Sequence, residues 1–476
     1  MLGLFEKSKK GVSGESLTYK KEDPPVVDWK RFYKKVFTLV VPLALQNLVN
    51  VGVQAADVIM LGMVSEYSLA GAAIANQVTF IMVLIIFGLT SGLTVLTSQY
   101  WGKKDLRTIE KIMAMGLKSG VFVAILFVVV SQFIPEVVLS IFTRSPEVLS
   151  EGVMYLRIIS ISYVFMAITM TYLFVMRSVE RVIVATVIYT ISLVTNITLN
   201  VILIFGVGPI PAMGVVGAAI GTVITRVLEL VYILIYSKFK NKDIKIRPKY
   251  LLHSDKVLRK DFLRYAMPVL INEAIWGVAI SANTAILGHL GSAAIAANSV
   301  AQVTRQLSQV VTFGLAGTTA IVLGKTLGKG KLEEARLYGA KFMKMAVIMG
   351  AVGGALILLS SPIIRANLNL GYDAQRHLQF MFIVMSYYVV AQAFNATAIV
   401  GVFRAGADTR FGVIADTCSM WFFTIPLGYI AAFVLNWPVH IVYVILMFDE
   451  LIKLPLSAIH YKQKKWIKNV TREMER

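Results

Sequence analysis

The sequence has very little cysteine and little charge for its length. Its single cysteine, Cys418, lies in an apolar segment, which excludes a disulfide within the chain and a multi-cysteine metal site and favours a packed, inert thiol. Only 16% of the 476 residues are charged, whereas 57% are hydrophobic, more than the roughly 45–50% apolar content of soluble domains. The composition therefore excludes an ordinary soluble globular protein.

Motifs for catalysis are also missing. An enzyme within a membrane would need a metal or nucleophile cluster, but neither HExxH nor a DDxxD-like motif occurs, and the five histidines are scattered near loops or span ends. We therefore expect a protein that is not an enzyme and that needs no cofactor.

Long apolar blocks follow one another along the chain. Each is near the ~20 residues that cross ~30 Å of hydrocarbon, and each is continuous rather than alternating, unlike barrel strands. Turn residues such as GVGPIPAMG (206–214) separate the blocks. The predicted fold class is all-α, a polytopic membrane protein with about twelve transmembrane helices. The predicted spans are 37–64, 69–98, 111–134, 151–176, 182–206, 212–237, 264–290, 294–323, 339–364, 378–402, 411–436 and 438–459.

Basic residues are unevenly distributed between the two sides of the predicted membrane. The net charge of +20 would suit nucleic acid, but with a cytoplasmic N-terminus the outward loops hold only Arg144, Arg365 and Arg376 of the 47 lysines and arginines. This positive-inside bias predicts a multi-pass protein of the plasma (inner) membrane, with both termini cytoplasmic. Its partner is then the lipid bilayer and not nucleic acid. The segment before the first span is too polar to be the apolar region of a signal peptide.

The chain repeats itself at an offset of 226 residues. Pro42 falls on Pro268, and the FGL triplet at 87–89 falls on the one at 313–315. Six spans separate the two copies, and an even number preserves orientation, so we predict two pseudo-symmetric six-helix bundles with the default ligand site between them. The predicted segments are a cytoplasmic N-terminal segment (1–35), an N-lobe (36–237), a cytoplasmic linker (238–260), a C-lobe (261–460) and a cytoplasmic C-terminal tail (461–476).

Few ionisable residues lie within the predicted spans, where each is expensive and therefore informative. Asp57 lies in the outer half of span one, and Glu273 lies near the midplane of span seven. The repeat places Asp57 on Asn283 and Glu273 on Asn47, which suggests that one lobe couples an ion and the other meets a cationic substrate. Arg305 is the most deeply placed cation and a possible partner of Glu273. The alternatives, an aspartate that reaches interfacial water and a structural glutamate, stay open.

Other polar residues within the spans have simpler interpretations. Arg226 and Glu229, at i and i+3, are expected to form a structural pair. Four further residues near the inner ends of spans eleven and twelve, where cytoplasmic water is expected, are interpreted as structural or gating groups: Asp416, Asp449, Glu450 and Lys453.

Asn196 and Asn200 are four residues apart in span five, so their amides share a helix face. With Thr222 of span six and Asp57 they would form an all-oxygen cluster suited to a proton or a hard cation such as Na⁺. Intramembrane asparagines also serve as contacts between helices, and this alternative stays open.

Several stretches together resemble one known family. The chain from about 36 to 465 is similar to the multidrug and toxic compound extrusion (MATE) transporters, which are cation-coupled antiporters. The matching stretches are Pro42 with ADVIMLG (56–62), TNITLNVILIFG (195–206), GVVGAAIGTVI (214–224) and FRAGADTRF (403–411).

The resemblance implies roles for specific residues. Asp57, Asn196, Asn200 and Thr222 correspond to an N-lobe cation site, although members with the full sodium-type site have aspartate where Asn200 stands. Another branch uses a glutamate in span seven, which Glu273 resembles, and an aspartate in span ten, where this chain offers only Asn395.

We therefore expect a secondary antiporter, functional as a monomer, that exports small organic, cationic or amphipathic compounds in exchange for H⁺ or Na⁺. The resemblance implies that its lobes alternate in access and that cation binding bends span one near Pro42. Glu273, Arg305, Asn283 and Asn395 are the candidates for a C-lobe substrate or cation site. The alternative functions are a lipid-linked saccharide flippase of the same superfamily and an intramembrane enzyme.

Overall fold

Helices account for nearly all of the computed structural model, which describes residues 27–241, 243–252, 255–367 and 371–472. The helical conformation follows from the apolar blocks, because a backbone in hydrocarbon must satisfy its hydrogen bonds internally. The all-α fold class is thus confirmed. Of the predicted terminal segments, positions 1–26 and 473–476 lie outside the described residues.

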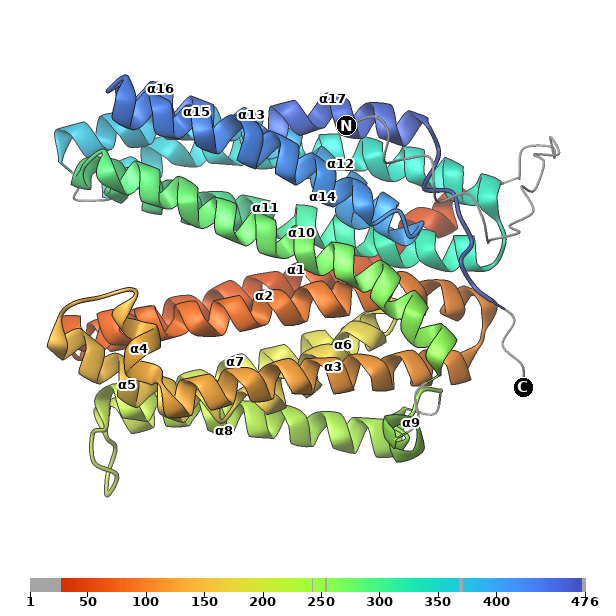
Figure 1. The fold of residues 1–476 in the computed structure, drawn as a ribbon, viewed down its shortest axis with the longest axis horizontal. Coiled ribbons are helices and arrows are strands. Elements are labelled where there is room, and N and C mark those ends of the chain that lie inside the picture. Colours follow the sequence, from red (N-terminus) through yellow and green to blue (C-terminus); the bar gives the residue numbers. More distant parts are fainter. Residues whose placement is uncertain (1–26, 242, 253–254, 368–370, 473–476) are drawn as a thin grey trace.

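The first half of the chain forms one bundle, the N-lobe, drawn in red to yellow-green in Figure 1. Its first helix begins earlier than the predicted span, because the side chain of Asp28 caps it by accepting a hydrogen bond from the backbone N–H of Arg31 at 3.0 Å. The helices are α1 (Trp29–Gly62), α2 (Glu66–Lys103), α3 (Leu106–Phe133), α4 (Pro135–Ser140), α5 (Pro146–Ser160), α6 (Tyr163–Ser178), α7 (Val182–Phe205), α8 (Gly214–Ile235) and the π-helical turn η1 (Tyr236–Lys240).

The second half forms the C-lobe, which lies beside the N-lobe (Figure 1). A short helix, α9 (Pro248–Leu252), lies in the linker between the lobes. The C-lobe helices are α10 (Lys256–His289), α11 (Ser292–Gly328), α12 (Leu332–Asn367), α13 (Tyr372–Ala396), α14 (Arg410–Asp416), α15 (Ile425–Tyr429), α16 (Val439–Leu446) and α17 (Asp449–Lys462), with π-helical segments η2 (Thr397–Phe403), η3 (Thr417–Thr424) and η4 (Ile430–Val434).

Two of the twelve predicted spans are interrupted. Span four is the pair α5 and α6, bent by 52°, and span twelve is divided into α16 and α17. Within the described residues, ten helices are long and apolar enough to cross a membrane, or eleven if the bent pair is one span. The last pass fails this test because it is broken and carries Asp449, Glu450 and Lys453. The two-bundle layout is nevertheless consistent with twelve passes.

The repeat is visible where the lobes meet. Helix α1 packs against α11, and α2 packs against α10, which are equivalent pairs under the offset of 226 residues. A Cβ on Gly88 would lie 2.7 Å from the Cα of Leu270, and a Cβ on Gly314 would lie 3.1 Å from the backbone N of Ala44. The offset of 226 residues relates Gly88 to Gly314 and Ala44 to Leu270, so the two contacts are equivalent. Glycine at these positions therefore allows the two lobes to approach closely, twice and in the same way.

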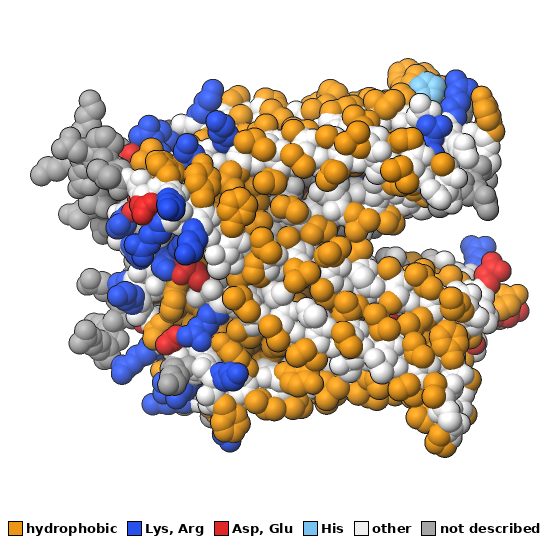
Figure 2. Space-filling model, turned by 180° about the vertical axis from the view of Figure 1, so that it is seen from behind, with side chains coloured by type: hydrophobic (Ala, Val, Ile, Leu, Met, Phe, Trp, Pro, Cys, Tyr) orange, Lys and Arg blue, Asp and Glu red, His pale blue; other side chains and the backbone are white. Residues whose placement is uncertain are grey.

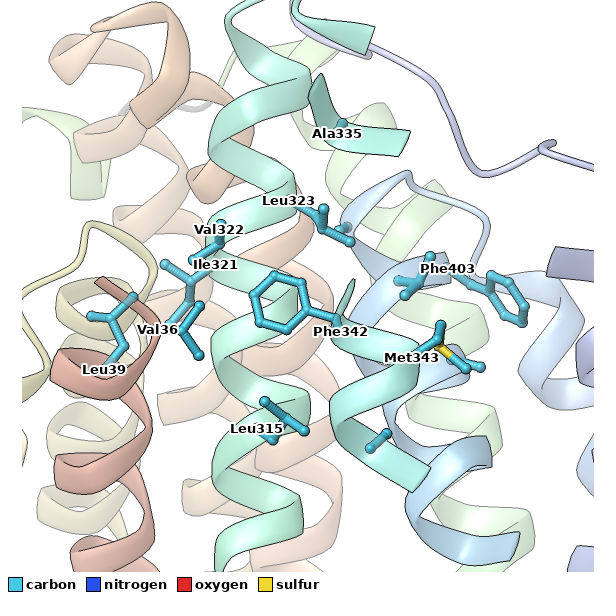
Figure 3. Packing of buried hydrophobic residues seen from close by; sticks show 14 of the residues in the cluster. Val36, Leu39, Leu315, Ile321, Val322, Leu323, Ala335, Phe342, Met343 and Phe403 are labelled. Atoms are coloured by element: carbon cyan, nitrogen blue, oxygen red, sulfur yellow. The ribbon is translucent and has the colours of Figure 1, made fainter. Parts of the chain in front are cut away.

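Basic side chains gather at one end of the molecule (Figure 2), which we call the basic end. It carries the ends of α2 and α11, the linker and the C-terminal segment. Apolar packing joins the lobes near this end: Val36 and Leu39 of α1 lie in one buried cluster with Ile321 of α11 and Phe342 of α12 (Figure 3). At the opposite end the space-filling surface is deeply notched between the lobes (Figure 2). The molecule is closed at the basic end and open at the other.

The chain beyond α17 crosses from the C-lobe to the N-lobe. Trp466 is 1% exposed, and the side chain of Gln99 in α2 donates hydrogen bonds to the carbonyls of Ala405 (2.7 Å) and Lys468 (3.1 Å). Its amide oxygen accepts from the backbone N–H of Val470 at 2.8 Å. This C-terminal segment thus completes the contact between the lobes at the basic end.

Candidate functional site

A cavity of about 540 Å³ lies within the N-lobe, among α1, α2, α5, α6, α7 and α8. Charged and amide side chains from four of these helices converge on it, in addition to the aromatic rings of Phe80, Tyr155 and Tyr189. The charged and amide groups that line it are Asn50, Gln54, Asp57, Asn76, Gln77, Asn196, Arg226 and Glu229.

The four residues predicted as a cation site lie together. The Asn200 amide donates a hydrogen bond to the carboxylate of Asp57 at 2.6 Å and another to the Asn196 amide oxygen at 3.3 Å. Asn196 in turn donates to the hydroxyl of Thr222 at 3.4 Å. The helical spacing of the two asparagines places both amides on the face of α7 that meets α1 and α8. Their role as a cation site stays a prediction.

A glycine of α8 makes room for this cluster. A Cβ on Gly221 would lie 2.6 Å from the amide oxygen of Asn200. That oxygen is buried and accepts no hydrogen bond from any described residue. The cluster therefore retains one free oxygen ligand beside the carboxylate of Asp57.

Arg226 and Glu229, which also line the cavity, balance each other's charge. Arg226 donates to both carboxylate oxygens of Glu229 at 2.9 Å, the structural pair predicted from their spacing. Asp57 forms no ion pair with any described residue, and Arg226 acts on it only at longer range. The carboxylate of Asp57 is thus the excess negative charge of this cavity.

Pro42 lies inside α1, which continues as one helix on both sides of it. The hydroxyl of Thr186 donates to the Pro42 carbonyl at 3.2 Å, and Gln46 donates to the Thr186 hydroxyl at 2.7 Å and to the Val182 carbonyl at 3.0 Å. These contacts with α7 hold α1 beside the proline. The predicted bend at Pro42 stays a prediction.

The four C-lobe candidates do not form one site. The predicted pairing of Arg305 with Glu273 is wrong: Glu273 accepts from Arg404 at 2.6 Å, whereas Arg305 donates to Gln302 (2.5 Å) and Tyr388 (3.4 Å). The chain stays helical through residue 405, three residues beyond the expected end of span ten, and Arg404 in this extension is buried in the interior and not in a loop.

The remaining two C-lobe candidates are buried amides. Asn395 donates to the carboxylate of Glu450 at 2.7 Å and to its carbonyl at 2.8 Å. Asn283 is 4% exposed, and its amide oxygen accepts no hydrogen bond from a described residue. Neither contacts Glu273.

A second cavity, of about 290 Å³, lies between the lobes. Arg177 and Arg404 line it with Ser91, Phe87 and Phe313. The interpretation that Arg305 is the most deeply placed cation is therefore incomplete, because Arg177 and Arg404 also lie in the interior. Arg404 was missed because FRAGADTRF looks like a loop, and Arg177 because its basic side chain lies at the end of span four.

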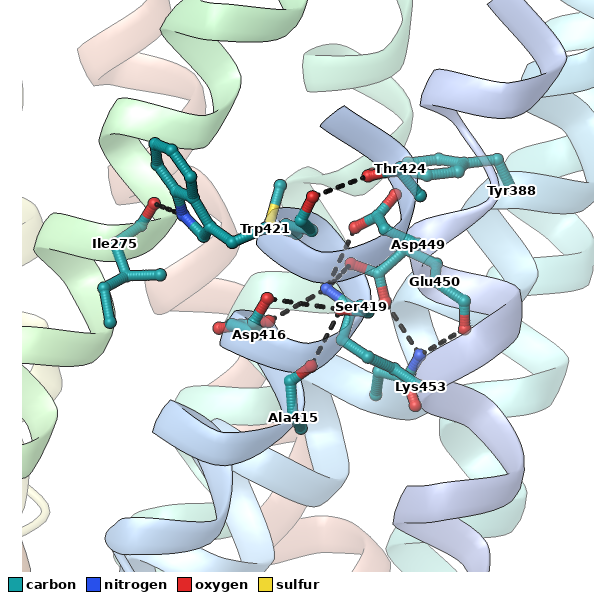
Figure 4. Close-up of polar contacts among 12 residues, drawn as sticks. Ile275, Tyr388, Ala415, Asp416, Ser419, Trp421, Thr424, Asp449, Glu450 and Lys453 are labelled. Atoms are coloured by element: carbon teal, nitrogen blue, oxygen red, sulfur yellow. Dashed lines mark hydrogen bonds and ion pairs between the residues drawn. The ribbon is translucent and has the colours of Figure 1, made fainter. Parts of the chain in front are cut away.

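The predicted gating residues of spans eleven and twelve are not exposed to water. Each is at most 5% exposed, and the three carboxylates surround the ammonium group of Lys453 (Figure 4). The expectation of contact with cytoplasmic water is wrong because α13, α14 and α17 pack around the group.

Two helical bundles that meet across a glycine-lined seam, with a polar cavity inside one of them, have the architecture of a multi-pass membrane transporter. The chain belongs to the MatE family, whose model matches residues 42–202 and 268–430. The two matched segments begin at Pro42 and Pro268, the positions that the repeat relates. The resemblance identified from the sequence is confirmed.

Individual relatives are distant but cover most of the chain. A probable multidrug resistance protein NorM of Haemophilus ducreyi is 24% identical over 415 residues, covering 85% of this chain and 88% of that protein. An uncharacterized transporter, YisQ of Bacillus subtilis, is 21% identical over 433 residues, covering 91% and 94%.

Solved structures share the fold. A MATE protein in the bent conformation has a TM-score of 0.83 at 16% identity, covering 91% of this chain and 95% of that chain. A MOP superfamily transporter from Pyrococcus furiosus has a TM-score of 0.82 at 16% identity, with the same two coverages. At such identity the likeness supports the fold alone.

Proposed function

We propose that this transporter is a multidrug efflux antiporter that exports small organic, cationic or amphipathic compounds in exchange for H⁺ or Na⁺. One observation carries the proposal: the carboxylate of Asp57 faces a cavity of about 540 Å³, and its only hydrogen-bond partner among the described residues is a neutral amide. A carboxylate without a counter-ion at this depth is costly. Binding a proton, Na⁺ or an organic cation removes that cost.

Competition for one negative charge provides a coupling mechanism. When the coupling ion binds Asp57, it neutralises the charge that would hold a cationic substrate, and the substrate leaves. The lobes then rock about the α1–α11 and α2–α10 contacts, with a bend of α1 near Pro42, so that the cavity faces one side at a time. The names of the relatives support drug export as the outcome.

The orientation proposed with this mechanism places the basic end in the cytoplasm of the plasma membrane. The exported substrate is then released at the open end. The protein needs no cofactor beside the coupling ion, and because each N-lobe cavity is built within one chain, a monomer suffices.

The available energy is adequate. One charge that moves down 100 mV yields ~2.3 kcal/mol, and a tenfold ion gradient adds ~1.4 kcal/mol. Together they support a substrate gradient of roughly a few hundredfold at one-to-one stoichiometry.

The test is efflux of a cationic dye from liposomes that contain the purified protein, with imposed pH or Na⁺ gradients. We expect one of these gradients to drive transport in the wild type and not in Asp57→Asn. Glu136→Gln, which alters an exposed carboxylate paired with Arg157, is the matched control. If neither gradient drives dye movement, secondary antiport is wrong.

The cavity between the lobes supports a second candidate, the lipid-linked saccharide flippase. The Nε atom of Arg177 is buried without a hydrogen-bond partner, and Arg404 lines the same cavity. The guanidinium groups of arginine pair well with phosphate oxygens. Flipping of a fluorescent polyprenyl phosphate in the same liposomes, without gradient-driven dye efflux, would favour this alternative.

A further inference from the structure

A group of buried charges in the C-lobe takes no part in the proposed N-lobe coupling. We define the C-lobe charge cluster as Asp416, Asp449, Glu450 and Lys453. We infer that this cluster binds one exchangeable proton and is thus a second proton-binding site. Proton binding itself does not depend on the proposed function; only its use in transport does.

The contacts converge on one ammonium group (Figure 4). The Nζ atom of Lys453 lies 3.0 Å from Asp416, 3.0 Å from Asp449 and 2.8 Å from Glu450. All four side chains are buried, at 2–5% exposure. An ammonium group has three donors and no more, so Lys453 is saturated by the three carboxylates.

The charges within the cluster do not cancel. Three carboxylates and one ammonium group leave two excess negative charges if every group is ionised. Arg305 is a further cation nearby: it donates a hydrogen bond to the hydroxyl of Tyr388 at 3.4 Å, and Tyr388 interacts electrostatically with Asp449 and Glu450. Counting Arg305 still leaves one negative charge.

The remaining neighbours add no compensation. Glu273 of α10 interacts electrostatically with Asp416, but it is already paired with Arg404. A buried charge without a counter-ion is neutralised by a proton rather than retained. The count therefore calls for one bound proton, shared by the three carboxylates as a coupled group.

The N-terminus of α17 allows the proton to leave again. Asp449 and Glu450 occupy the first turn of α17, where the helix N-terminus favours negative charge. This N-terminus lies inside the lobe because the last pass is broken between α16 and α17. The bound proton thus stabilises the cluster by reducing its excess charge, and the helix N-terminus stabilises it after the proton has left.

Asn395 can form hydrogen bonds with either form of Glu450. Its NH₂ group donates to the Glu450 carboxylate at 2.7 Å and to the Glu450 carbonyl at 2.8 Å. A protonated carboxyl group keeps an acceptor oxygen, so the amide can hold both bonds whether or not the proton is bound. Its own amide oxygen is buried and accepts nothing from a described residue.

The backbone is irregular beside Asp416 and beside Asn395, the neighbour of Glu450. Asn395 lies just before the π-helical segment η2, and Asp416 lies just before η3. Segments of this kind occur frequently at functional sites. No described group of histidines, cysteines or acidic residues is arranged to hold a metal ion.

Infrared spectroscopy tests the proposal, because a protonated carboxyl group has a C=O stretching band that a carboxylate lacks. The protein is examined in liposomes at about pH 6, where exposed carboxyl groups are ionised. Asp57→Asn with Glu273→Gln removes the bands of two other buried acids. We expect one band to remain, and to be lost when Asp449→Asn and Glu450→Gln are added.

A second variant makes the proposal falsifiable if that combination does not fold. Lys453→Met removes the ammonium group, so the cluster should bind one further proton and the band should grow about twofold, by the charge count above. Glu229→Gln, at a buried but paired carboxylate of the N-lobe, should leave the band unchanged. A band that is insensitive to both the Asp449/Glu450 and the Lys453 substitutions would overturn the inference.

The two proposals fail in different ways. Loss of the band in Asp449→Asn/Glu450→Gln together with no gradient-driven efflux would support the proton site and refute antiport. Gradient-driven efflux with an unaffected band would refute the proton site and leave antiport intact.

Discussion

The carboxylate of Glu180 in the N-lobe and the ammonium group of Lys325 in the C-lobe form an ion pair, with 2.5 Å between Oε2 and Nζ. Glu180 lies in the turn between α6 and α7 and also contacts Lys35 of α1 at 2.5 Å. Burial disfavours its charged form, but the two ammonium groups outweigh burial and hold the pKa of Glu180 below its usual range. One carboxylate therefore ties both lobes together at the basic end.

We predict that Glu180→Gln loosens this end. Each partly exposed pair contributes about 0.2–1 kcal/mol, so the open form should gain up to roughly fivefold in population. The measurement is the rate of thiol labelling at Ser98→Cys, a seam position in α2 that faces Gly324, in a Cys418→Ala background. Glu136→Gln is the control. Equal labelling rates in the two variants would contradict the prediction.

The same pair predicts a pH dependence. Because the pKa of Glu180 is lower in the closed structure than in an unpaired glutamate, its stabilisation is complete above the usual glutamate pKa of about 4.3. It is lost as the pH falls through the lowered value. The labelling rate at Ser98→Cys, relative to that of a fully exposed cysteine at the same pH, should therefore rise on acidification when Glu180 is present, and less in Glu180→Gln.

The buried pair of Arg404 and Glu273 predicts an asymmetric pair of variants. Arg404 also donates to Ser91 of the N-lobe at 2.7 Å. Arg404→Met leaves the Glu273 carboxylate uncompensated and should cost about 3–5 kcal/mol. Adding Glu273→Gln removes the uncompensated charge and should restore much of the loss. Thermal unfolding in detergent measures both; a double variant no more stable than Arg404→Met would show that the pair contributes through something other than charge.

The N-lobe cluster predicts a gain of sodium dependence. Asn200→Asp would place a second carboxylate beside Asp57, and two carboxylates with amide and hydroxyl oxygens are a better set of ligands for a hard cation. We expect Na⁺ to protect this variant against heat at concentrations about tenfold lower than those that protect the wild type. Asn283→Asp, at the C-lobe position equivalent to Asp57, is the matched control and should not show this gain.

The orientation in the membrane is testable with the same cysteine-free background. Ser145→Cys lies in the turn before α5 at the open end, and Lys238→Cys lies in η1 at the basic end. In intact cells an impermeant thiol reagent should label the former and not the latter. The reverse pattern would place the basic end outside.

The sequence could predict those parts of the structure that depend on local pattern. The apolar blocks and the 226-residue repeat predicted the bundles, and the spacing of Asn196 and Asn200 placed both amides in one chain of hydrogen bonds that ends on Asp57. The partner of Glu273 could not be predicted, because Arg404 lies just beyond the predicted end of span ten, where the chain is still helical. The burial of the C-lobe charge cluster could not be predicted either. The distance of a residue from the end of its span indicates how deep it lies in the membrane, but not which helices pack around it.

The C-terminal segment has a consequence for how the molecule is made. Gln99 is synthesised long before two of its partners, Lys468 and Val470, which follow it by 369 and 371 residues. During synthesis the N-lobe therefore waits in the membrane with a buried amide that lacks these bonds. The basic end can therefore close in this way only after the segment around Trp466 has been made, and a chain that stops before it would lack these contacts between the lobes.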